Sequence, residues 1–224
     1  VSKNSGVACK TMDMNMNMKE KTLSGFIGEL SSSAPTPGGG GASALVGAVG
    51  AALCSMAASL TTGKKKFAEY EEDLSRIIKE AKAKSEELLN LIQRDADVFE
   101  PLSRAYSIPK GTPGREETLE AALRLACSAP LEMLRCIGEV VELIEELSHK
   151  CSKLVISDVA VAAAACRAAM DGAAMNVYIN TALMTDREYA AAADAEAEAL
   201  IARYRAVCDK IYAEIEAQIR GNSK

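Results

Sequence analysis

Residues 42–60 read ASALVGAVGAALCSMAASL, a stretch with no charged and no aromatic side chain. Small residues recur every four positions at Ala44, Ala48 and Ala52, a helical spacing that lets another helix approach closely. The stretch also has about the length of a membrane span, and the lysines at 64–66 would suit a cytoplasmic anchor. Because it is poor in Leu, Ile and Phe, and no second such stretch follows, we predict a buried helix of a soluble bundle and no membrane association.

The composition extends the helical prediction to the whole chain of 224 residues. About one residue in six is Ala, the best helix former, whereas aromatic residues make up 4% and Trp is absent. A β-sandwich or barrel would need more aromatic and β-branched side chains. The length is sufficient for one domain with a sizeable core. The fold class predicted is therefore all-α.

The spacing of apolar residues places the remaining elements. We predict further helices near 20–30, 67–106, 116–147 with a kink or break at Pro130, 155–184 and 186–220. Segments rich in Pro and Gly predict loops at 31–41 and 107–114. The expected architecture is a single-domain bundle of about six helices over residues 19–224, preceded by a flexible tail at 1–18.

Charge, cysteine and histidine content argue against several classes of protein and site. The net charge of −5 gives no general basic surface for nucleic acid. Seven cysteines, an odd number without a C-x-x-C pair, fit a reduced cytoplasmic protein. The one histidine, His149, cannot build a histidine-cluster metal site, so we predict no metal.

The run Pro35-Thr36-Pro37-Gly38-Gly39-Gly40-Gly41 leads into a predicted helix. Bare backbone N–H groups and the positive helix end suit a ligand oxygen or an anion. The Gly-Lys-Ser/Thr of a phosphate-binding P-loop is missing, and a tight turn between helices is an equal alternative. Lys64 and its two neighbours fit a solvated helix end better than a ligand clamp.

Asp95 occupies an unusual place on its predicted helix. At about 100° per residue it lies within about 60° of Leu88, Ile92 and Phe99, in the middle of an apolar stripe, whereas Asp97 points to the opposite side. A carboxylate on the core side has to be paired, neutralised or functional, and desolvation would raise its pKa toward that of a general acid or base. The alternative is a buried hydrogen bond between helices.

The segment 155–184 carries a polar face lined by small residues. Asp158 lies near one end of this face, and Asn176 and Asn180 lie near the other. A straight helix separates Asp158 from Asn176 by about 27 Å, so one site can use both only if the helix bends or a second subunit supplies the other end. The structural alternatives are an N-cap role for Ser157 or Asp158 and hydrogen bonds between helices for the asparagines.

Five stretches carry a family resemblance: FIGELSSSAPTPGGGGASALVGAVGAAL (26–53), LTTGKKKF (60–67), DADVF (95–99), IPK (108–110) and SKLVISDVAVAAAACRAAMDGAAMNVYINTALMTD (152–186). In these stretches the sequence resembles the cyclodeaminase/cyclohydrolase family that acts on one-carbon forms of tetrahydrofolate. Gln93 stands where many relatives carry an additional acidic residue, and the Gly-Asn pair that precedes the S-D motif in the family is absent.

The resemblance implies an all-helical homodimer with sites near the subunit interface. It implies one of two reactions: hydrolysis of 5,10-methenyltetrahydrofolate to 10-formyltetrahydrofolate, or cyclodeamination of 5-formiminotetrahydrofolate to 5,10-methenyltetrahydrofolate and ammonia. Neither requires a metal or redox cofactor. Because no formimidoyltransferase sequence is fused to this chain, we expect the cyclohydrolase.

The resemblance also suggests a role for each candidate residue. Asp95 would transfer protons and stabilise the amidinium, and Asp158 would bind or orient the pterin. Pro37 and the glycines Gly38–Gly41 would let the ligand approach the backbone, Asn176 and Asn180 would bond to the ligand or bridge helices, and Lys64 would meet the folate glutamates. A non-enzymatic scaffold or membrane-associated bundle is the alternative from another class, and it predicts no folate binding.

Overall fold

The computed structural model describes residues 17–221, and this part of the chain contains six α-helices and no strand. Two short 3-10 helices, η1 (Met18–Glu20) and η2 (Lys65–Tyr70), precede α1 and α3. The α-helices are α1 (Leu23–Leu30), α2 (Gly39–Ser59), α3 (Glu71–Tyr106), α4 (Arg115–Lys150), α5 (Ile156–Thr181) and α6 (Arg187–Gly221). The predicted all-α, single-domain bundle is therefore confirmed.

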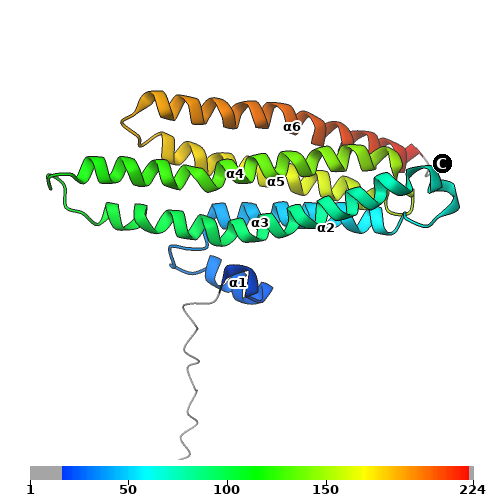
Figure 1. Ribbon diagram of the computed structural model, residues 1–224, viewed down its shortest axis with the longest axis horizontal. Helices are drawn as coiled ribbons and strands as arrows, with labels where there is room; N and C mark the ends of the chain where they lie inside the picture. The colour runs from blue at the N-terminus through cyan, green and yellow to red at the C-terminus, as the bar shows by residue number, and fades with distance from the viewer. Residues whose placement is uncertain (1–16, 222–224) are drawn as a thin grey trace, which may run out of the picture.

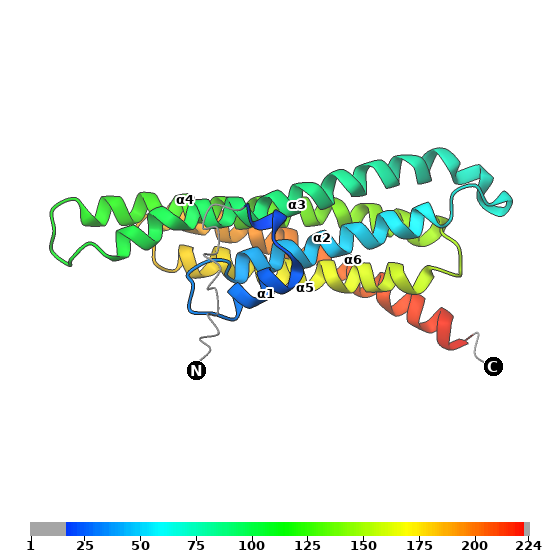
Figure 2. The ribbon, with the colours of Figure 1, turned by 90° about the horizontal axis from the view of Figure 1, so that it is seen from below.

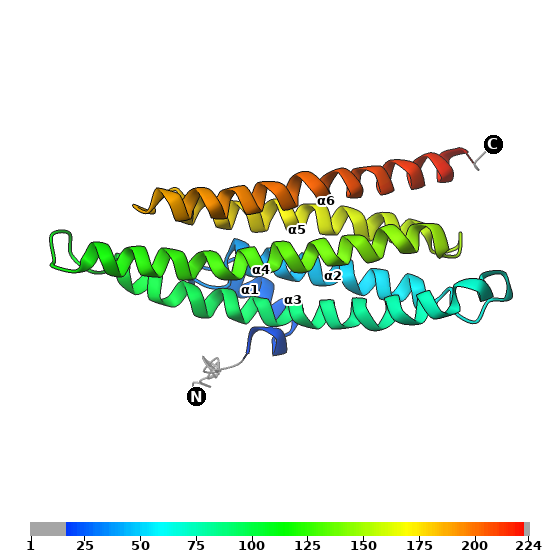
Figure 3. The same cartoon turned by 45° about the horizontal axis from the view of Figure 1, so that its top comes forward.

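Helices α2–α6 run side by side, and successive helices point in opposite directions (Figures 1 and 3). The central element is α4, which contacts α2, α3, α5 and α6. Its buried face supplies large side chains to the core, among them Met133, Leu134, Ile137 and Ile144. Because α2 lies between α3 and α5 and runs opposite to both, its start lies beside the C-terminal half of α3 and the last turns of α5.

Close packing of α2 against α5 explains the small residues of both helices. A Cβ atom on Gly50 would lie 2.5 Å from the Cys166 sulfur and 3.2 Å from the carbonyl oxygen of Ala162, so only glycine lets these backbones approach so closely. Among the described residues, α2 is the one helix that could cross a bilayer by length and composition, but most of it is buried inside the bundle. The burial agrees with the predicted core helix.

Two details differ from the sequence prediction. Gly39, Gly40 and Gly41 form the first turn of α2, whereas we had assigned them to the preceding loop. Pro130 neither ends nor divides a helix, since α4 continues through it from Arg115 to Lys150. Interior proline is tolerated because tertiary packing of the buried face of α4 outweighs the lost hydrogen bond.

The segment before α2 lies outside the bundle, on the side of α2 (Figures 1 and 2). In α1 only Phe26 is buried, while Leu23 and Ile27 are 73% and 52% exposed. Residues 1–16 of the predicted tail lie outside the described residues, but Met18 already belongs to η1 and donates its backbone N–H to the Gln93 side chain at 3.0 Å. This hydrogen bond holds the segment against α3.

Candidate active site

A cavity of about 190 Å³ lies where the start of α2 and the end of α5 meet α3 near Asp95 and α4 near Pro130. Its wall combines a carboxylate, two amides, glycine backbone and apolar side chains. The residues that line it are Pro35, Thr36, Gly38, Gly39, Gly40, Asp95, Phe99, Ala126, Pro130, Asn176, Ile179 and Asn180. The predicted loop, the predicted carboxylate and the predicted asparagines therefore meet in one place.

Asp95 is the only acidic side chain in this wall. Burial raises its pKa to about 6, because the surrounding protein solvates the carboxylate less well than water does. The backbone N–H of Gly41, at the start of α2, is directed at the carboxylate and opposes the shift. Such a group exchanges a proton near neutral pH, as a general acid or base requires.

Gly40 is where α2 approaches the carboxylate most closely. A Cβ atom at this position would lie 2.3 Å from Oδ1 of Asp95 and 2.5 Å from both Cγ and Oδ2. No side chain fits in that space unless the carboxylate or the helix moves. The glycine run therefore allows a close approach between backbone and carboxylate, which supports both the ligand hypothesis and the tight-turn hypothesis of the sequence analysis.

Asn176 and Asn180 present their carbonyl oxygens as acceptors. The side-chain amide nitrogen of Asn176 donates to the Gly172 carbonyl at 2.8 Å, and that of Asn180 donates to the Asn176 carbonyl at 2.8 Å. Because these bonds lie within α5, the asparagines do not bridge helices as the structural alternative proposed. Each side-chain oxygen keeps its capacity to accept an N–H group from a ligand.

Pro130 adds to the accepting character of the wall. Proline has no backbone N–H, so the carbonyl of Ala126, four residues earlier on α4, cannot receive its usual helical hydrogen bond. Both residues line the cavity. Asp95, the two asparagine oxygens and this carbonyl can accept from a ligand that is cationic or carries N–H donors, while the Thr36 hydroxyl and the free N–H groups at the start of α2 can donate to a ligand oxygen.

The structure separates the other predicted residues from this cavity. Pro37 is buried behind the wall, where it is 3.3 Å from a Cβ placed on Gly41. Asp158 lies in the first turn of α5, at the opposite end of that helix, and Val155 takes the N-cap position, so Asp158 is not the cap. Lys64 donates to the Ser152 hydroxyl at 3.1 Å near that same end. Within one chain, neither Asp158 nor Lys64 joins the Asp95 cavity.

Comparison with known proteins gives a family for this arrangement. The sequence pattern of the formiminotransferase-cyclodeaminase family matches residues 22–199, most of the chain and all of the cavity. The chain belongs to this family. No group of three or more His, Cys, Asp or Glu residues that could hold a metal ion occurs between residues 17 and 221 of this family member.

Three similar proteins show how far the likeness extends. A methenyltetrahydrofolate cyclohydrolase of Methylorubrum extorquens is 38% identical over 89% of this chain and 98% of its own length. A formimidoyltransferase-cyclodeaminase of Mus musculus is 33% identical over 76% of this chain, which spans only 32% of that longer protein. The crystal structure of a formiminotetrahydrofolate cyclodeaminase from Thermotoga maritima superimposes with a TM-score of 0.83 at 27% identity, covering 90% of this chain and 98% of that one.

Sequence reasoning missed four of the twelve residues in the cavity wall of this family member. Phe99 follows Asp95 by four residues and Ile179 follows Asn176 by three, so the same helical arithmetic would have placed them beside the predicted residues. Ala126 and Pro130 carried no such signal, because nothing in the sequence says which part of α4 faces Asp95. Pro35 and Thr36 belong to the loop run that the sequence singled out, although only Pro37 and the glycines were given a role in binding.

Proposed function

We propose that this protein is a methenyltetrahydrofolate cyclohydrolase, which adds water to 5,10-methenyltetrahydrofolate and forms 10-formyltetrahydrofolate. The observation that carries the proposal is Asp95: a partly buried carboxylate with a pKa of about 6 in a cavity whose lining residues include no lysine, arginine or histidine. The substrate has a positively charged carbon between two nitrogens, and such a cation complements this wall. The relative of similar length with the cyclohydrolase name supports the same choice.

The proposed reaction needs a proton to move from water to nitrogen. Asp95, as a carboxylate, accepts a proton from a water molecule while the water oxygen forms a bond to the cationic carbon. The bond from that carbon to N5 then breaks, the proton held by Asp95 passes to N5, and the remaining hydroxyl proton leaves to solvent as the C=O bond forms. The carbon remains on N10 as a formyl group. The negative charge of Asp95 also stabilises the cation before water adds, most effectively in a poorly solvated cavity.

Formiminotetrahydrofolate cyclodeaminase activity is the second candidate. The relatives that carry this name and the superimposed Thermotoga maritima structure favour it. In that reaction N10 attacks the formimino carbon and the amino nitrogen leaves as ammonia, so a protonated Asp95 would supply the proton that the leaving nitrogen needs. A pKa of about 6 leaves both protonation states accessible near neutral pH.

Assaying the two substrates in parallel tests the proposal. We expect purified protein to accelerate loss of the methenyl absorbance of 5,10-methenyltetrahydrofolate above the uncatalysed rate in the same buffer. Ammonia release from 5-formiminotetrahydrofolate, measured with the same protein, should be slower. Faster ammonia release would transfer the assignment to the cyclodeaminase, and inactivity toward both substrates would reject a folate enzyme.

We further propose that the protein works as a homodimer joined through the outer faces of α2 and α5. These faces expose large apolar side chains, with no charged residue on α2. Arg167 and Asp171 of α5 are turned toward α6, where they pair with Asp209 and Arg205. An apolar face of this kind favours burial against a partner. Its most exposed large residues are Val46, Val49, Met56, Leu60, Val161, Met175 and Ile179.

A twofold axis across this face would account for the separated candidate residues. Because α2 starts at the Asp95 cavity and α5 ends there, two copies packed in opposite directions would bring Asp158 and Lys64 of one copy toward the cavity of the other. Asp158 would then bind the pterin and Lys64 would meet the glutamates of the substrate. Sedimentation should give twice the mass of one chain, and Val49→Glu should lower both the mass and the activity. A fully active monomer would contradict this arrangement.

The remaining expectations fit the same proposal. The described cysteines are all free and buried, which supports a reducing, cytoplasmic compartment. Water and the residues of the chain supply every group that the proposed reaction uses, so we propose that it needs no cofactor. A net charge of −5 argues against nucleic acid as a partner. Release of the protein from cells without detergent would support the absence of a membrane association.

A further inference from the structure

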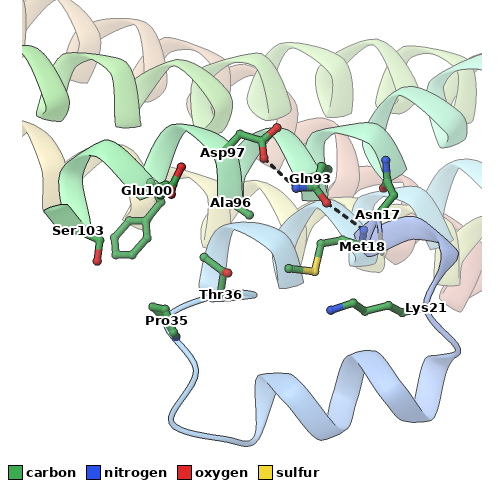
Figure 4. Close-up of a pocket in the computed structure, with 11 residues that line it drawn as sticks. Asn17, Met18, Lys21, Pro35, Thr36, Gln93, Ala96, Asp97, Glu100 and Ser103 are labelled. Carbon is green, nitrogen blue, oxygen red and sulfur yellow. Dashed lines mark hydrogen bonds between the residues drawn. The ribbon is translucent and has the colours of Figure 1, made fainter. Parts of the chain in front are cut away.

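A second cavity, of about 440 Å³, adjoins the Asp95 cavity. It lies between the η1–α1 segment, the loop before α2 and the outer side of α3 (Figure 4). Pro35, Thr36 and Phe99 line both cavities, so the two spaces share a wall at these residues. Met18 and Lys21 extend into the second cavity from the segment outside the bundle.

Size indicates that the proposed substrate needs more room than the Asp95 cavity gives. Pockets that bury most of a drug-sized ligand measure about 300–1,000 Å³, and the Asp95 cavity, at about 190 Å³, is smaller. A folate joins a fused ring system to a benzoyl-glutamate arm, so the Asp95 cavity holds the reacting carbon with only part of the substrate around it. The second cavity, at about 440 Å³, lies within that range of volumes and adjoins the Asp95 cavity.

A carboxylate held in place gives the second cavity its polar character. Oε1 of Gln93 accepts the Met18 backbone N–H at 3.0 Å, and Nε2 of Gln93 donates to Oδ1 of Asp97 at 2.8 Å (Figure 4). Among the described residues, no hydrogen bond reaches Oδ2 of Asp97. This second oxygen therefore keeps its accepting capacity while the first fixes the side chain.

The charges around the cavity leave Asp97 uncompensated. Lys21 pairs with Glu29, and Glu100 pairs with Arg104. No lysine, arginine or histidine within residues 17–221 forms an ion pair with Asp97. The cavity should therefore attract N–H donors and repel carboxylates.

We propose that this second cavity binds the pterin ring of the substrate, with Asp97 accepting hydrogen bonds from the amino and ring N–H groups of its pyrimidine edge. The pterin is the donor-rich end of a folate, whereas the glutamate arm carries carboxylates and would leave the site in another direction. The inference rests on the proposed function. It gives a role to Asp97, which the sequence placed on the solvated side of its helix and which is exposed in the structure, and it adds α3 to the pterin contacts proposed for Asp158 of a second copy.

Two fragments of the substrate test whether Asp97 contacts the pterin ring or the benzoyl-glutamate arm. A tetrahydropterin without an arm and p-aminobenzoylglutamate are used as competitive inhibitors of wild-type protein that turns over 5,10-methenyltetrahydrofolate. In Asp97→Asn we expect the inhibition constant of the tetrahydropterin to rise about tenfold, which is the loss of one charge-assisted hydrogen bond. The inhibition constant of p-aminobenzoylglutamate should stay unchanged, and KM for the full substrate should rise more than kcat falls.

Glu72→Gln is the matched control, because Glu72 is an exposed acidic residue of the same helix far from both cavities. It should leave both inhibition constants at the wild-type values. An unchanged tetrahydropterin constant in Asp97→Asn, or a change confined to p-aminobenzoylglutamate, would overturn the inference while the cyclohydrolase proposal stands. Wild-type protein without turnover of either folate would instead reject the proposed function itself.

Discussion

The two ends of the α2–α5 pair carry similar residues in different surroundings. At one end Asp95 lies beneath Gly40 in a cavity, and burial raises its pKa to about 6. At the other end Lys64 bonds to the Ser152 hydroxyl, while Asp158 stays partly exposed in the first turn of α5. The polar residues at the Asp95 end surround a cavity, whereas those at the Asp158 end lie on the surface of the chain.

The difference shows what makes a charged residue chemically useful. Polarity is present at both ends, but at the Asp95 end a carboxylate is buried without a cation beside it, so its protonation balance changes. Most other carboxylates of the bundle pair with a lysine or arginine, as Asp73 pairs with Lys150, whose hydrogen bond holds the pKa of Asp73 below its usual range. Burial without pairing therefore marks the first end as the place of chemistry.

Asp95→Asn should have the largest effect on activity. It removes the proton-transfer group while keeping the shape of the side chain, so we expect kcat to fall by about 10²–10⁴ with either folate substrate. Steady-state kinetics on both substrates measures the loss. A full rate in both assays would contradict the role of Asp95.

The same variant should be more stable than the wild type at neutral pH. The folded state binds a proton at Asp95 more tightly than the unfolded state, so the stabilisation is complete below about pH 3.9 and is lost as pH rises through about 6. The ionised carboxylate then costs about 3 kcal/mol, which asparagine does not incur. Urea unfolding from pH 4 to 8 should show the advantage of the variant growing up to about pH 6 and then staying constant.

Gly40→Ala should lower activity by displacing the Asp95 carboxylate without removing it. Its Cβ atom would collide with the Asp95 carboxylate, so either the carboxylate turns away or α2 shifts. A displacement of about 1 Å at a catalytic group can cost about 100-fold, and we expect a loss of that size in kcat/KM. Gly28→Ala in α1 is the control: no atom lies within 4 Å of its Cβ, so activity should be unchanged.

The pH dependence of kcat/KM tells which protonation state of Asp95 works. If the carboxylate accepts a proton from water, kcat/KM above the uncatalysed rate should fall about tenfold per pH unit below about 6. If a protonated Asp95 assists the departure of ammonia, activity should instead fall above about 6. A profile flat from pH 5 to 8 would show that Asp95 does not exchange the proton.

The sequence predicted the helices and Asp95 for a physical reason. Alanine content and apolar spacing reflect burial within a single helix, and the angle of Asp95 on its helix follows from the same period. The positions of Ala126 and Pro130 at the cavity depend on which helices become neighbours, which a single helical period does not contain. Asp158 shows the reverse case, because its face on α5 was predicted but its distance along the helix keeps it from the Asp95 cavity.

Refolding Asp95→Asn together with Asp158→Asn gives the smallest expected change in activity. It is also the sharpest test of whether the two ends of the α2–α5 pair belong to one site. If the second copy supplies Asp158 to each site, Asp158→Asn alone should be impaired, as Asp95→Asn is. A randomly mixed dimer of the two variants would contain one intact site, formed by Asp95 of one copy and Asp158 of the other. Because half of the dimers are mixed and each has two sites, about a quarter of the wild-type activity should return after the variants are unfolded and refolded together.

Each variant refolded alone is the control, and it should recover no activity. If Asp158 acted on the cavity of its own chain, every site in the mixture would lack one of the two carboxylates, and mixing would restore nothing. Full activity of Asp158→Asn alone would show that the far end of α5 has no part in the reaction. Recovery near a quarter would instead join the two ends of the α2–α5 pair into a single site made by two chains.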